Sequence, residues 1–211
     1  MTKPLYWDDA TRVLASRDPV LATLIETYPG IHLTRRGDPF TTLARAIVGQ
    51  QISVKAAQTI WERLLAACRS DTAGRLDPAT VQRKRLATLR TCGLSERKAS
   101  YIRDLAKHFA SARLDPATWS ALDDEALIEA LVDVKGIGRW TAEMFLMFHE
   151  MRANVLPVDD IGLQKAVAKL YLDGQRPTLA ALRTLGERWQ PYRSVATWYL
   201  WRSLDPIPVE Y

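Results

Sequence analysis

Apolar residues recur at helical spacing along most of this chain, whereas alternating apolar and polar positions are scarce. Residues three and four positions apart share one face of an α-helix, so the pattern predicts a nearly all-α protein. Apolar spacing predicts helices at Phe40–Val48, in runs capped by Ser53 and Ser95, and in segments near 160–172, 178–188 and 192–203.

Four Asp-Pro pairs mark further helix starts, at 18–19, 38–39, 77–78 and 115–116. An aspartate at the N-cap accepts backbone N–H groups, and the fixed φ of proline suits the first helical position. Another helix begins at Asp123 and Asp124 and runs to about Val132. Glycine ends or interrupts helices at Gly93 and in the short break Gly49–Ile52.

Two glycines flank one apolar residue in the segment Val134–Gly138, between two expected helices. Glycine tolerates positive φ angles, so backbone N–H groups can point outward at the start of the following helix, where the dipole favours an anion. The segment therefore resembles a helix–hairpin–helix grip for a DNA phosphate. An ordinary glycine C-cap is an equally good explanation of the two glycines alone.

A second candidate segment is Leu156–Gly162, which contains Asp159 and Asp160. Aspartate before a helix is a good N-cap, so capping explains this pair without any chemistry. The helix from Arg139 to Glu150 spans roughly 18 Å at 1.5 Å per residue. After the return loop, a carboxylate can lie beside the cleft that the hairpin would border. Asp159 and Asp160 can therefore be helix caps, catalytic residues, or both.

Net charge and the absence of long apolar runs indicate which kinds of partner the protein has. Lys and Arg exceed Asp and Glu by 29 to 24, and the pI near 9.3 favours a polyanionic partner. No apolar run approaches the roughly 18 residues that span a bilayer, and the start of the sequence has no signal-peptide core. We expect a soluble protein in the cytoplasm, nucleoid or nucleus, with no membrane partner.

Cysteine and histidine usage indicates no metal centre. Cys68 and Cys92 are too few for a disulfide framework or an iron–sulfur cluster. His32, His108 and His149 lie far apart and form no ligand motif, although folding could still bring residues together. We expect reduced thiols and structural histidines.

Five segments together resemble the helix–hairpin–helix DNA glycosylase superfamily, in its 3-methyladenine DNA glycosylase II (AlkA-like) branch. The resemblance covers about residues 40 to 203, in the family's order. Its segments are Ala46–Ser53, Gly93–Ala99, Val134–Ala142, Leu156–Gly162 and Tyr192–Trp201.

The resemblance implies an all-α helix–hairpin–helix glycosylase fold, with two helical subdomains flanking a cleft for DNA and the damaged base. The central subdomain would be residues 39–152, and residues 1–38 plus 153–211 would form the second. Longer bacterial members carry a further N-terminal domain, and we expect this chain to correspond to the catalytic core.

The family's functional positions transfer to specific residues of this chain. The catalytic carboxylate of the family opens the helix after the hairpin, so the resemblance assigns this role to Asp160. Phosphate binding falls to Gly136, Gly138 and Thr141. The base pocket would be lined by Trp140, Met144, Trp201 and, more weakly, Trp198. An electron-rich tryptophan face suits a cationic alkylated purine, whereas Met144 stands where the branch has an aromatic pocket residue. The remaining tryptophans are expected in the core.

Two departures from the family bear on the chemistry. Bifunctional relatives place a Schiff-base lysine where this chain has Trp140, so the resemblance implies a monofunctional hydrolase without a lyase step. The residue inserted into the duplex gap is leucine in the well-studied bacterial branch and Gln51 here.

No cofactor is expected to be required. Family members often hold a monovalent cation, Na⁺ or K⁺, with hairpin carbonyls, which would be those of Val132, Val134 and Ile137. No iron–sulfur cluster is expected.

The expected function is hydrolysis of the N-glycosidic bond of alkylated bases such as 3-methyladenine and 7-methylguanine, by a monomer acting on damaged double-stranded DNA through base flipping. Two alternatives remain. The enzyme could act on another lesion, such as uracil, hypoxanthine, an oxidised purine or a mismatch. The chain could also be a non-enzymatic DNA-binding protein that keeps the hairpin.

Overall fold

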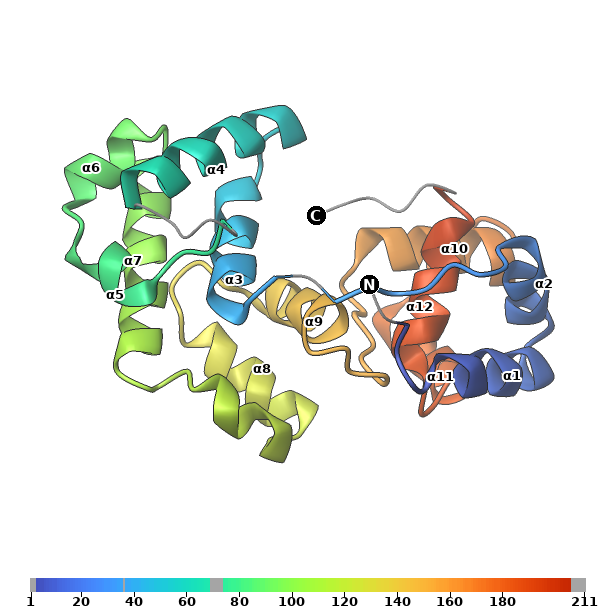
Figure 1. The fold of residues 1–211 in the computed structure, drawn as a ribbon. Coiled ribbons are helices and arrows are strands. Elements are labelled where there is room, and N and C mark those ends of the chain that lie inside the picture. The colour runs from blue at the N-terminus through green and yellow to red at the C-terminus, as the bar shows by residue number, and fades with distance from the viewer. Residues whose placement is uncertain (1–2, 36, 69–73, 206–211) are drawn as a thin grey trace. The chain divides into compact units, whose positions relative to one another are not determined.

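A computed structural model describes residues 3–35, 37–68 and 74–205, and its regular structure within these ranges is helical (Figure 1). The elements in chain order are α1 Trp7–Arg17, α2 Pro19–Thr27, α3 Pro39–Gly49, α4 Val54–Cys68, α5 Pro78–Arg83, α6 Leu86–Thr91, α7 Glu96–Ala110, the 3₁₀ helix η1 Pro116–Ala121, α8 Asp124–Val132, α9 Arg139–Phe148, α10 Ile161–Tyr171, α11 Leu179–Glu187 and α12 Arg193–Arg202.

All four Asp-Pro pairs begin helices, as predicted. The side chains of Asp18, Asp38 and Asp77 accept backbone N–H groups of α2, α3 and α5. Asp115 caps its element in the same way, but that element is the 3₁₀ helix η1. Its i to i+3 bonding shows at the end, where the Leu122 N–H donates to the Trp119 carbonyl at 3.1 Å. Short connectors of this kind commonly adopt the tighter helix.

Other predicted helix ends are also confirmed. Ser95 Oγ accepts the Lys98 N–H at 3.2 Å, and Asp123 Oδ1 accepts the Ala126 N–H at 2.8 Å. Gly93 closes α6 with φ +101°. The pattern did not single out α1, because its apolar face is short.

The described chain forms two compact units, and the chain passes between them within α9. One unit comprises Met1–Arg35 and Leu146–Glu210, and the other comprises Arg36–Phe145. The division predicted from the family resemblance, 39–152 against 1–38 plus 153–211, stays a prediction about domain organisation.

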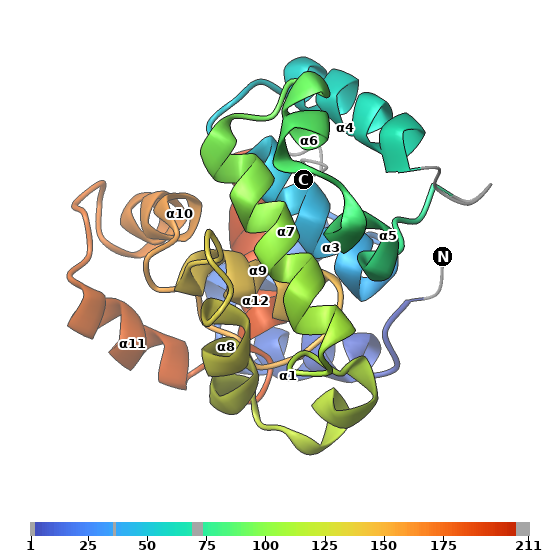
Figure 2. The same cartoon turned by 90° about the vertical axis from the view of Figure 1, so that its left-hand side faces the viewer.

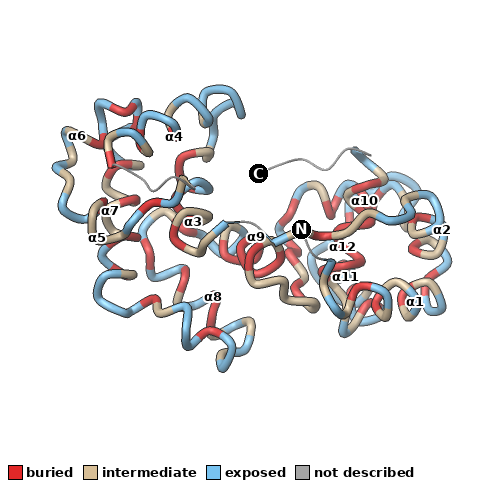
Figure 3. Tube along the Cα trace, in the orientation of Figure 1, coloured by how far each residue is buried: buried red, intermediate tan, exposed pale blue. Residues whose placement is uncertain are grey.

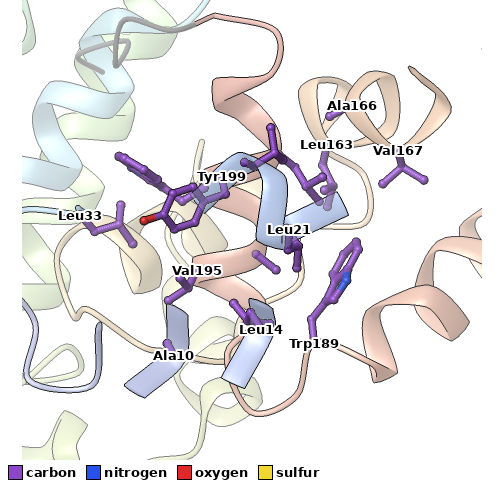
Figure 4. Packing of buried hydrophobic residues seen from close by; sticks show 14 of the residues in the cluster. Ala10, Leu14, Leu21, Leu33, Leu163, Ala166, Val167, Trp189, Val195 and Tyr199 are labelled. Carbon is purple, nitrogen blue, oxygen red and sulfur yellow. The ribbon is translucent and has the colours of Figure 1, made fainter. Parts of the chain in front are cut away.

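In the first unit, α12 packs against α1, α2 and α10. Apolar side chains from both ends of the chain meet here in one core (Figure 4). Leu14 and Leu21 from the N-terminal segment join Leu163, Trp189 and Val195 from the C-terminal one, all at most 1% exposed. The helix that supports the Asp160 loop is therefore anchored through α12 to the first helices of the chain.

In the second unit, α7 packs against α3, α5 and α6, and Figure 2 shows it lying alongside α3. A row of edge-to-face aromatic contacts continues this core. Phe40 meets Phe109 at 5.3 Å between ring centroids, and Trp119 meets Phe145 at 5.5 Å. Buried positions recur at intervals along these helices (Figure 3). This packing holds α7 in place, and its residues Tyr101 and Asp104 contact the segment Val134–Gly138.

Among the described residues, no helix combines the length and the apolar character needed to cross a membrane.

Candidate functional site

Asp160 combines a helix cap with burial. It is the N-cap of α10, and its Oδ1 accepts the Leu163 N–H at 2.6 Å. Only 8% of the residue is exposed. A carboxylate this far out of water needs N–H donors and benefits from the positive end of a helix dipole. The capping interpretation is therefore correct, and it leaves the catalytic assignment as a prediction.

A second donor reaches the same oxygen from α12. The Trp201 Nε1–H donates to Asp160 Oδ1 at 2.8 Å. The Trp201 ring is stacked on Phe148, with centroids 6.0 Å apart and planes 7° from parallel. The stack fixes the indole plane, and the indole fixes the carboxylate.

Gly162 makes this approach possible. A Cβ at this position would lie 3.0 Å from Asp160 Oδ1 and 3.1 Å from the Cδ1 and Nε1 atoms of Trp201. These distances are tighter than nine in ten real Cβ contacts. Any larger residue at position 162 would have to displace the indole or the carboxylate by a few tenths of an ångström.

The loop before Asp160 is held from within α10. The Gln164 side-chain amide donates to the Val158 carbonyl at 2.8 Å. The Gln164 Oε1 in turn accepts two N–H groups from Arg176, at 3.0 and 2.7 Å. Buried hydrogen-bond chains of this type rigidify their surroundings, so the backbone that presents Asp160 is fixed.

The hairpin Val134–Gly138 has the turn geometry that the sequence predicts. The Val134 N–H donates to the Leu131 carbonyl and the Ile137 N–H to the Val134 carbonyl, at 3.2 and 3.1 Å. Gly136 has φ +87°, and a Cβ there would lie 2.2 Å from the Tyr101 ring. Position 136 therefore requires glycine for two reasons, its positive φ angle and the close approach of the Tyr101 ring.

Several hairpin N–H groups remain available for a ligand. In the described part of the chain, no hydrogen bond uses the N–H of Gly136, Gly138 or Thr141. The Lys135 N–H is different, because Asp104 Oδ2 accepts it at 2.9 Å. The amides of the three predicted phosphate-binding positions are thus not consumed internally.

Arg139 follows the hairpin, but its charge is already neutralised. It forms a bidentate ion pair with Glu125 and donates to Glu143 at 3.1 Å. These partners raise the pKa of the guanidinium, and the hydrogen bond to Arg139 lowers the pKa of Glu125. The pair ties α8 to the start of α9 across the hairpin.

The remaining predicted residues fall into two groups. Asp160, Trp201 and Trp198 belong to the first unit, whereas the hairpin, Trp140, Met144 and Gln51 belong to the second. Trp140 is 39% exposed and Met144 is half-buried, one turn apart on α9.

Trp198 has a different environment from the other aromatic candidates. It is 3% exposed and packs edge-on against Trp7 at 5.4 Å. It is therefore the least exposed of the three predicted pocket tryptophans.

Gln51 lies in the turn between α3 and α4 and is exposed. Its φ of +57° is in the left-handed region, which residues other than glycine and asparagine seldom adopt. The turn is thus a defined structure and not a simple break between helices.

Sequence reasoning did not identify the donors that hold these segments. The resemblance assigns Trp201 only to the pocket wall, and no local pattern marks Gln164 as a partner of the loop before Asp160. The Asp-x-Gly spacing of Asp160 and Gly162 was the available signal for a side chain resting on the carboxylate. Long-range hydrogen bonds leave no periodic pattern.

The described residues contain no group of three or more His, Cys, Asp or Glu side chains that could hold a metal ion. Cys68 and Cys92 are both buried free thiols. The expectation of reduced cysteines is confirmed.

Comparison with known proteins defines the class. Residues 44–191 match the model of the HhH-GPD superfamily of base excision DNA repair proteins, and the chain belongs to this family. The match includes the hairpin and the Asp160 loop. The all-α helix–hairpin–helix fold expected from the sequence is confirmed.

Three relatives place the chain within that class. It is similar to the DNA-3-methyladenine glycosylase 1 of Schizosaccharomyces pombe, with 32% identity over 87% of this chain and 80% of the relative. It is 30% identical to YfjP of Bacillus subtilis and spans 66% of that protein's length. A crystal structure of a DNA-3-methyladenine glycosidase from Bacillus halodurans has 36% identity and a TM-score of 0.86, covering 93% of this chain and 89% of the other.

Proposed function

We propose that this protein is a monofunctional DNA glycosylase that hydrolyses the N-glycosidic bond of alkylated bases, of the 3-methyladenine and 7-methylguanine type, in base excision repair. The observation that carries the proposal is the buried Asp160 carboxylate, held by Leu163 and Trp201 in a chain of this family. The names of the relatives in Schizosaccharomyces pombe and Bacillus halodurans support the same substrate class.

Double-stranded DNA with a damaged base is the proposed partner, bound by a monomer inside the cell. The target base is inaccessible in the stack, so the enzyme extrudes the nucleotide, and a weakened base pair lowers that cost. The hairpin amides of Gly136, Gly138 and Thr141 hold a backbone phosphate. Gln51 occupies the gap in the duplex.

Bond cleavage passes through a sugar with oxocarbenium character. Asp160 is the proposed catalytic residue, because a fixed carboxylate beside the anomeric carbon stabilises that positive charge while water supplies the oxygen. An N-alkylated purine already carries positive charge and leaves as a neutral base. No general acid is then required.

Trp140, Met144 and Trp201 are the proposed walls of the base pocket. Aromatic faces attract a cationic base. Trp201 would serve twice, as a wall and as the donor that orients Asp160. Trp140 stands where bifunctional relatives have their lysine, which supports hydrolysis without a lyase step.

No cofactor is proposed to be required, and no iron–sulfur cluster. A Na⁺ or K⁺ ion at the hairpin fits the backbone, because no described N–H donates to the carbonyls of Val132 and Ile137. The Val134 carbonyl would complete the set with its second lone pair. The ion would stiffen the hairpin. Equal melting temperatures in K⁺ and in tetramethylammonium would exclude this site.

The test of the proposal is base release from alkylated duplex DNA by wild type and Asp160→Asn. Asparagine is also a good N-cap, so the fold should persist while the rate falls about 10²–10³-fold or more. Asp123→Asn, the same change at the N-cap of α8, is the matched control and should release bases at the wild-type rate. Undiminished release by Asp160→Asn would refute the catalytic assignment.

A panel of duplexes separates the other candidate functions. Faster release of uracil, hypoxanthine or an oxidised purine than of 3-methyladenine would move the enzyme to another lesion class. DNA binding without release of any base would identify a non-enzymatic binding protein.

A further inference from the structure

The turn between α3 and α4 has an unfavourable backbone conformation, which contacts with other parts of the protein must stabilise. Gln51 has φ +57°, which costs a non-glycine residue roughly 1 kcal/mol relative to ordinary backbone. Gln51 and Ile52 are exposed, so their own side chains contribute little burial. The contacts that fix the turn must come from its neighbours, Val48 and Gln50.

Lys98, in the first turn of α7, supplies such contacts. Its Nζ donates to the Val48 carbonyl at 2.8 Å and to the Gln50 carbonyl at 2.7 Å. Both carbonyls lie at the C-terminal end of α3, where backbone acceptors lack helical partners and a cation is favoured by the dipole. Lys98 is half-buried, and burial lowers the pKa of its ammonium group. The ammonium group of Lys98 therefore points at backbone carbonyls of the protein.

Gln50 extends the connection to the hairpin. Its Nε2 donates to the Gly136 carbonyl at 2.8 Å. Gly136 also lies against the ring of Tyr101, one turn along α7 from Lys98. The turn, α7 and the hairpin are therefore joined in pairs by direct contacts, all inside the second unit.

We propose that Lys98 and Gln50 are positioning residues that fix the Gln51 turn relative to the hairpin. Gln51, the proposed plug of the duplex gap, and the phosphate-binding hairpin amides then meet DNA at a fixed separation. The proposal rests on the proposed function, because it assigns these residues to base extrusion. A preformed spacing reduces the cost of ordering two loops when the duplex binds.

This role differs from that of an ordinary DNA-binding lysine. A lysine that neutralises a phosphate adds about one unit to the salt dependence of binding. Lys98 donates two of its three N–H groups to protein carbonyls, so its removal should leave the salt dependence of DNA binding unchanged. The removal should instead lower the rate of base release at the step in which Gln51 enters the duplex.

The first experiment compares lesion contexts. Lys98→Met and Gln50→Met keep side-chain length but remove the donors. Under single-turnover conditions, 7-methylguanine release from a fully paired duplex should fall at least about tenfold in Lys98→Met, which loses hydrogen bonds from a charged group. It should fall about two- to tenfold in Gln50→Met, which loses a bond between neutral groups. Release of the same lesion from a bulge, where extrusion is cheap, should fall much less. Lys107→Met, at an exposed position of α7, should match wild type on both substrates.

The second experiment needs no bond cleavage. 2-Aminopurine beside an abasic-site analogue reports unstacking by the plug when protein binds. Lys98→Met and Gln50→Met should lose most of the fluorescence change that wild type and Lys107→Met give. The salt slope for undamaged duplex should be the same in all four proteins. Melting curves of the two variants test whether the fold tolerates each change.

Equal losses on paired and bulged substrates, a full fluorescence change in both variants, or a smaller salt slope for Lys98→Met would each overturn the proposal. A wild type that gives the fluorescence change but releases no alkylated base would refute the proposed function instead. If Lys98→Met does not fold, Gln50→Met carries the test alone, since it removes only the link to the hairpin.

Discussion

The indole N–H of Trp201 allows the most direct test of how Asp160 is held. Trp201→Phe removes the donor that lies 2.8 Å from Oδ1 and keeps an aromatic ring against Phe148. The carboxylate retains the Leu163 N–H at 2.6 Å, so the cap of α10 should survive. The change therefore affects the orientation of one carboxylate more than the fold.

The expected loss follows from that single contact. A hydrogen bond to a charged group contributes about 1.5–3 kcal/mol, and this range corresponds to roughly 10- to 100-fold in rate if the orientation matters in the transition state. The assay is release of 7-methylguanine from duplex DNA with excess protein, which isolates the chemical step from product release.

Gly162→Ala tests the same contact without changing the aromatic ring. The added methyl group would lie 3.0 Å from Asp160 Oδ1 and would push the indole away. Trp61→Phe, at a buried indole of the other unit, is the control and should keep the wild-type rate. Rates within about twofold of wild type for both Trp201→Phe and Gly162→Ala would refute the positioning of Asp160 by Trp201.

Three further changes test other parts of the structure. Gly136→Ala places a methyl group 2.2 Å from the Tyr101 ring at φ +87°, and it should cost more than about 1 kcal/mol in urea unfolding and weaken binding of undamaged duplex. Because Arg139 lowers the pKa of Glu125, their pair stabilises the protein above the ordinary carboxyl pKa and loses this effect as pH falls through the lowered one. Glu125→Gln should remove that part of the acid dependence, under about 1 kcal/mol for an exposed pair, and identical stability-against-pH curves would contradict it. Asp18→Ala should cost about 3 kcal/mol in urea unfolding, since it leaves a buried indole and a tyrosine hydroxyl without their acceptor, and a cost below about 1 kcal/mol would show that water replaces it.

Local rules accounted for most of the helices. Aspartate and serine caps act within three residues, so the starts at Asp38, Ser95 and Asp123 could be predicted from neighbouring letters alone. The 3₁₀ character of η1 was not predictable, because Asp-Pro opens both types of helix. Helix α1 was missed because only Trp7, Ala10 and Leu14 mark its buried face.

The candidate site was predictable in its parts and not in its connections. Glycine spacing identified the hairpin, and the family resemblance singled out Asp160. The contacts of Trp201 with Asp160 and of Lys98 with Val48 join residues dozens of positions apart. No spacing rule describes such pairs, because they depend on how helices pack.

The unit that contains Asp160 is built from both ends of the chain, and this has a consequence for biosynthesis. Residues 36–145 leave the ribosome as one continuous stretch and can pack as soon as they emerge. Helices α1 and α2 must wait until α10 and α12 are made, on the order of ten seconds at ordinary elongation rates. During that interval Leu14 and Leu21 lack their native partners, so a nascent chain would have the unit proposed to bind the DNA phosphate well before it has its proposed catalytic carboxylate in place.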